Sequence, residues 1–96
     1  MKIGDRVQII NTGETYATYY EVAERMCAKH WVPGNILSSL SYGVIVNSIS
    51  HPEDWNTKII YLVRSLFDKD YEILIGDKGL RKIKSGELNH RNTTVI

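Results

Sequence analysis

Three apolar segments in the second half of the chain constrain the fold more than any other feature: YGVIVNSI, TKIIYLVRS and YEILIG. They are rich in isoleucine, valine and tyrosine, which favour strands, and polar residues typical of turns separate them. The second and third are joined through FDKD, which is short enough for a hairpin turn. The sequence therefore predicts an antiparallel meander of three strands. Because the 57–65 strand is apolar on both faces, the side that faces the core stays open.

The first half of the chain predicts one strand and one helix. KIGDRVQII alternates apolar and polar residues around Ile3 and Val7, which favours a first strand. Farther on, Thr18 and Glu21 have the spacing of a capping box, which starts a helix by satisfying its free backbone amides. We predict that this helix covers about 19–30. Its apolar face consists of residues spaced by three and four: Tyr19, Val22, Ala23, Met26 and His30.

A fifth short strand, Arg81–Ile83, is predicted after a turn at Gly79. Together these elements predict a mostly β fold: a small, five-stranded, partly open antiparallel barrel with one α-helix inserted after the first strand. We expect one domain over residues 1–83. The polar stretch 84–96 is expected to be a flexible C-terminal tail.

Composition limits the classes of function. The chain has 96 residues, 43% of them hydrophobic, and a net charge of +1, so it lacks the strong positive field of many nucleic-acid-binding proteins. Its only cysteine, Cys27, has no partner for an internal disulfide, and no apolar leader follows Met1. No apolar run approaches the roughly 20 residues that span a bilayer. We therefore expect a cytoplasmic protein without a membrane-spanning helix.

The order of the elements resembles that of a Src-homology-3-type barrel: a strand opening with GDRV, a long excursion, three meander strands, a tight turn and a short closing strand. The excursion here contains the predicted helix. IGDRVQI and YGVIVNSI are also similar to the openings of ribosomal and transcription-factor barrels of that kind. The resemblance implies a ligand groove between the first excursion and the loop after the second strand.

Nearly the whole stretch from Ile3 to Ile83 resembles small proteins encoded by large tailed bacteriophages. The resemblance rests on the segments TYATY, YLVR and IGDKGL. The resemblance implies a phage accessory protein that binds something in the cytoplasm of the infected bacterium, a class that includes inhibitors of host defence. It carries over no active-site residue. A host protein is accordingly the expected partner, and the expected activity is to inhibit or redirect it without catalysis.

Aromatic and acidic residues in two facing loops form the predicted partner-binding site. Tyr16 and Tyr20 flank the start of the helix, and Trp55 lies in the HPEDWN loop across the groove. Large aromatic side chains often carry most of the binding energy of an interface. Glu53 and Asp54 make the same rim acidic and favour a basic partner. Packing in the core or over the end of the barrel is the competing interpretation for each aromatic residue.

Two other functions remain open. A basic strand edge can hold nucleic acid or a nucleotide, with Tyr61 or Tyr71 stacking on a base. The cations of this edge are Arg64, Lys78, Arg81 and Lys82.

An enzyme built on Cys27 and His30 is the third interpretation, but the sequence shows no base or oxyanion site for it. Two potential ligands do not make a metal site, so we expect no metal and no cofactor. The exposed edge strands of an open barrel also allow a homodimer.

Overall fold

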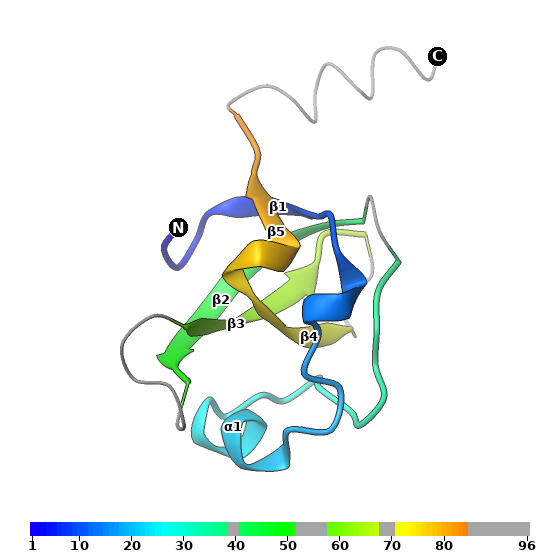
Figure 1. Cartoon of the computed structure of the whole chain (residues 1–96), viewed down its shortest axis with the longest axis vertical. Coiled ribbons are helices and arrows are strands. Elements are labelled where there is room, and N and C mark those ends of the chain that lie inside the picture. Colours follow the sequence, from blue (N-terminus) through cyan, green and yellow to red (C-terminus); the bar gives the residue numbers. More distant parts are fainter. Residues whose placement is uncertain (39–40, 52–57, 68–70, 85–96) are drawn as a thin grey trace.

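The computed structural model describes residues 1–38, 41–51, 58–67 and 71–84. Its five strands form one antiparallel sheet in the order β4-β3-β2-β1-β5, with a single α-helix (Figure 1). The elements in chain order are β1 (Arg6–Ile9), η1 (Thr12–Glu14), α1 (Tyr20–Arg25), β2 (Tyr42–Ser50), β3 (Ile59–Ser65), β4 (Glu72–Gly76), η2 (Asp77–Gly79) and β5 (Leu80–Lys82). The predicted mostly β fold with a helix after the first strand is confirmed, and the sheet is consistent with a partly open barrel.

The meander predicted from the three apolar segments is present as β2, β3 and β4. β2 and β3 pair from Gly43 with Ser65 to Ser50 with Ile59, with an irregularity between Ile45 and Asn47. β3 and β4 pair from Ile60 with Gly76 to Arg64 with Glu72. Extra residues at such a bulge bend a strand, which helps a short sheet to curve.

Both faces of β3 are buried from Ile60 to Val63, which explains why this part of the strand is apolar on both faces. Tyr61 and Val63 join the first core cluster, whereas Ile60 and Leu62 join a second one on the opposite face. The first cluster also contains residues from every other strand: Val7, Ile9, Ile45, Ile73, Ile75 and Leu80. The second is closed by Val22, Ala23 and Met26 of the helical segment. A hydrophobic core therefore lies on each face of the sheet at β3, and α1 covers the second of the two cores.

The helix is shorter than the sequence predicted. It covers Tyr20–Arg25, and its N-cap Tyr19 makes no side-chain capping bond, so the proposed capping box of Thr18 is wrong. The chain leaves the helix at Cys27, whose φ is +52°. There the amide of Ala28 donates to the carbonyl of Ala23 and the amide of Cys27 to that of Glu24, the two bonds of a Schellman motif.

The segment after the helix, residues 27–35, is an irregular strap at the edge of the sheet. It is bound to β4 through Glu72: the His30 amide donates to the Glu72 carboxylate, Trp31 forms a parallel bridge with Glu72, and the Asn35 side chain donates to the Glu72 carbonyl. These contacts end the helix early. Figure 1 shows α1 and this strap on the side of the molecule farthest from β5. The predicted tail 84–96 lies outside the described residues apart from Lys84.

Candidate functional site

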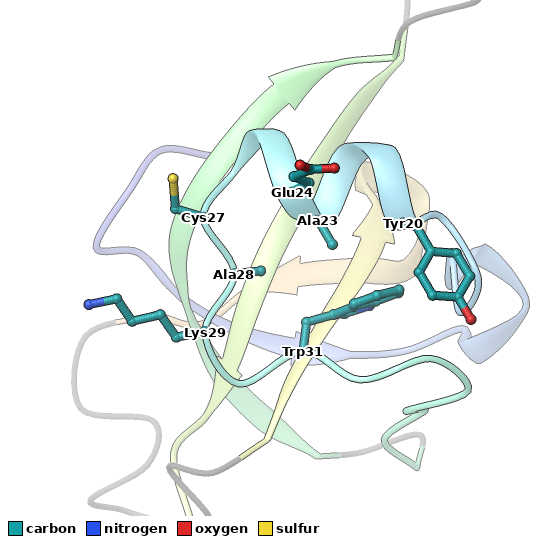
Figure 2. Close-up of a pocket in the computed structure, with 7 residues that line it drawn as sticks. All are labelled: Tyr20, Ala23, Glu24, Cys27, Ala28, Lys29 and Trp31. Atoms are coloured by element: carbon teal, nitrogen blue, oxygen red, sulfur yellow. The ribbon is translucent and has the colours of Figure 1, made fainter.

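An open pocket of about 480 Å³ lies between α1 and the strap (Figure 2). We call it the Tyr20 pocket. Its lining consists of Tyr20, Ala23, Glu24, Cys27, Ala28, Lys29 and Trp31. Figure 2 shows the rings of Tyr20 and Trp31 together at one end, and Cys27 and Lys29 at the other. The lining is mostly apolar and comes from one continuous stretch of chain, so the local fold of residues 20–31 determines its shape.

An exposed aromatic ring and a half-buried one form one wall of the pocket. Tyr20, the first residue of α1, is 60% exposed, whereas Trp31 is half-buried and packs against the second core cluster. Their ring centroids are 5.6 Å apart at an interplanar angle of 83°, an edge-to-face contact. The exposed ring is thus supported by one that the core holds in place.

Glu72 fixes the position of the strap relative to the sheet. Its carboxylate is buried, with Oε1 accepting from the His30 amide at 2.9 Å and Oε2 from the Arg64 guanidinium at 2.9 and 3.2 Å. A buried carboxylate is costly unless it is paired, and here both oxygens have charged or amide donors. Glu72 therefore holds Trp31 and its neighbours against β4 and preserves the far wall of the pocket.

Charges of both signs border the apolar floor. Glu24 and Lys29 are exposed and make no ion pair with any residue that the structure describes. The neighbouring pair, Glu21 and Arg25, is joined at 2.8 Å on the exposed surface of α1. Glu24 and Lys29 are thus available to a partner that lies over the pocket.

The structure separates the residues of the predicted partner-binding site. Tyr20 lies on the pocket with Trp31. Tyr16 is half-buried in a different aromatic group, where its ring centroid is 5.6 Å from that of Tyr19 and 5.6 Å from that of His51. The predicted residues of the HPEDWN loop lie outside the described residues: Glu53, Asp54 and Trp55.

Trp31 is a pocket residue that is not among the site residues predicted from the sequence. The position of Trp31 depends on the length of α1. Because the helix ends at Arg25, the strap runs back along the helix to its first turn, where Trp31 contacts Tyr20. Its indole Nε1 is buried and has no hydrogen-bond partner among the described residues.

The cations of the predicted basic edge are largely engaged within the protein. Arg64 is bound to Glu72, and the Arg81 side chain donates to the Gln8 amide oxygen at 2.9 Å. Lys82 lies 3.7 Å from a carboxylate oxygen of Asp5. The expectation that Tyr61 stacks on a base is wrong, because its ring is buried among the apolar side chains of the first core cluster. Tyr71 is 44% exposed.

Cys27 and His30 do not share a helix, because both lie in the strap. Cys27 is exposed on the pocket, and His30 uses its backbone amide to contact Glu72. Within the described ranges no group of three or more histidine, cysteine or acidic residues is placed to hold a metal ion. The same residues contain no helix long and apolar enough to cross a membrane.

Asp5 and Tyr61, which both lie outside the pocket, have shifted pKa values. The Lys2 backbone amide donates to the Asp5 carboxylate and, with nearby positive charge, lowers the pKa of Asp5 below its ordinary 3.8. Burial raises the pKa of Tyr61 above its ordinary 10.0, and the negative charges of Asp77 and Asp5 add to the effect.

No protein-family model, curated protein or solved structure matches this chain.

Proposed function

We propose that this protein is a non-catalytic binding module that docks a partner protein at the Tyr20 pocket. The observation that carries the proposal is the exposed Tyr20 ring, supported edge-to-face by the half-buried Trp31 beside an open apolar pocket. Tyrosine and tryptophan are enriched among the residues that dominate interface energies. A ring already held by its neighbour loses little conformational freedom on binding, which favours affinity.

For the partner we propose a protein of a bacterial host that the module inhibits or redirects in the host cytoplasm, including one of its anti-phage defences. Support for this comes from the resemblance of the chain to small proteins of large tailed bacteriophages. Tyr16 supports the same surface indirectly, because it packs on Tyr19, the N-cap of α1. The predicted acidic rim of Glu53 and Asp54 belongs to the same proposal, with a basic partner.

The test is capture of host proteins by three tagged forms of the chain: the wild type, Tyr20→Ala and Tyr71→Ala. Tyr71 is the matched control, since it is also an exposed tyrosine but lies just before β4 and not on the pocket. We expect a protein that withstands nuclease treatment to bind the wild type and Tyr71→Ala, with Tyr20→Ala weaker by about 30-fold or more, as for a residue that dominates an interface.

The alternative function, binding of nucleic acid or a nucleotide at the basic strand edge, gives the opposite pattern. Captured nucleic acid would be removed by nuclease, and a captured nucleotide would be recovered without any protein. The affinity of either would fall steeply with salt, and Tyr20→Ala would bind as well as the wild type. The internal partners of Arg64, Arg81 and Lys82 favour the protein-binding proposal over this one.

A further inference from the structure

A second, smaller pocket of about 100 Å³ lies where the end of β4 meets η1 and η2. We call it the Gly76 pocket, and it shares no lining residue with the Tyr20 pocket. Its lining includes Glu14, Tyr16, Lys58, Gly76, Asp77 and Lys78. The residues come from three separate parts of the chain, so the pocket exists only in the folded protein.

Two carboxylates and two amines line this small space without pairing. Glu14 and Asp77 supply the negative charges, and Lys58 and Lys78 supply the positive ones. None of these four side chains forms a salt bridge or a hydrogen bond with another residue in the part of the chain that the structure describes. A ligand that carries both signs of charge complements such a lining, whereas a simple anion or cation meets repulsion from half of it.

Gly76 keeps the pocket open. Its φ of −73° and ψ of 162° suit any residue, so the backbone does not require glycine there. A β-carbon would lie 3.3 Å from Oε2 of Glu14 and 3.7 Å from Cε2 of Tyr16. Any larger side chain at this position would extend among these groups and occupy the space between them.

From these observations we propose that the Gly76 pocket binds a small α-amino acid in its zwitterionic form. The ammonium group lies toward Glu14 and Asp77, the carboxylate toward Lys58 and Lys78, and the carbon atoms against the edge of Tyr16. The pocket is small, at about 100 Å³, so we expect it to take the smallest amino acids, such as glycine and alanine.

The test is a titration of the isotopically labelled full chain with glycine and with L-alanine, followed by the chemical shifts of its amides. We expect saturable changes centred on residues 14 and 76–78. Acetate and methylammonium, which each carry one of the two charges, should bind at least about tenfold more weakly. Changes that do not saturate, or acetate binding as tightly as glycine, would overturn the proposal.

Substitutions test the site independently of the fold. Gly76→Val should abolish the saturable changes because its side chain fills the pocket. Lys78→Met removes one carboxylate contact at an exposed position and should weaken glycine binding about tenfold. Lys29→Met, an exposed lysine on the other pocket, is the matched control and should bind glycine as the wild type does. Unchanged binding by a folded Lys78→Met protein would contradict the assignment, whether or not the valine variant folds.

Discussion

Cys27 shows how a single residue determines the shape of the Tyr20 pocket. It occupies the position after the C-cap of α1, where most helices that end in a Schellman motif have glycine. Cys27 is the only residue other than glycine with a positive φ in the described ranges. A β-carbon in that conformation contacts the adjacent backbone unfavourably. The strain is tolerated because the strap that follows is bound to β4 through Glu72.

Replacing Cys27 with glycine should therefore stabilise the protein. We expect Cys27→Gly to raise the free energy of unfolding by about 0.5–1 kcal/mol, because glycine adopts positive φ without the contact. Cys27→Ala is the control, since it removes the thiol and keeps the β-carbon. Urea denaturation of both variants measures the effect. A gain of equal size in Cys27→Ala would show that the thiol and not the backbone conformation is responsible.

The ionisation of Tyr61 lowers the stability of the fold at alkaline pH. Its pKa is raised in the folded protein, above all by burial, so the unfolded chain loses the phenolic proton at a lower pH than the folded one. The stability that Tyr61 contributes is therefore complete below about pH 10 and is lost as the pH rises from there through the folded pKa. Tyr61→Phe should lose less stability over that range than the wild type. Equal losses in denaturation curves above pH 10 would contradict this.

At the scale of elements, the strap and the segment before the helix together cover the outer edge of β4. The Tyr16 amide donates to the Leu74 carbonyl at 2.7 Å, Thr15 bridges Ile75, and Trp31 bridges Glu72. A covered edge does not recruit a strand from another chain. The opposite edge strand, β5, has three residues and carries exposed Arg81 and Lys82, and short charged edges also resist pairing. Both edges therefore oppose the homodimer that an open barrel allows.

The joint between the strap and the sheet depends on the charge of Glu72. Glu72→Gln leaves the Arg64 guanidinium without its buried counter-charge, so we expect a loss of about 2–3 kcal/mol in the free energy of unfolding. Glu21→Gln breaks an ion pair on the exposed surface of α1 and should cost no more than about 0.5 kcal/mol. Urea denaturation compares the two, and equal losses would show that Glu72 does not hold the strap.

For the whole molecule, the sheet could be predicted from the sequence because its signals are local. Alternation in the first strand and three apolar runs with turns between them specify the strands and their antiparallel order. The end of the helix could not be predicted, because Met26 and His30 continue the spacing of its apolar face. What stops it is the bond from the His30 amide to Glu72, which is 42 residues away in sequence.

The candidate site was predictable only in part for the same reason. Tyr20 was identified by its place at the start of the helix, which depends on local sequence signals. Trp31 was not, because its approach to Tyr20 depends on the early helix end. The sequence did contain a signal for the ion pair between Arg64 and Glu72, which holds the strap. The two residues carry opposite charges and lie opposite each other in the two strands of a hairpin.

The measurement that tests docking at the Tyr20 pocket most directly is amide hydrogen exchange of the whole chain, free and bound to the captured partner protein. We expect binding to slow exchange in residues 20–31, which form α1 and the start of the strap, and to leave β1 and β5 unchanged. Slower exchange confined to β1 and β5, with residues 20–31 exchanging as in the free chain, would contradict the proposed site and place the partner at the basic strand edge.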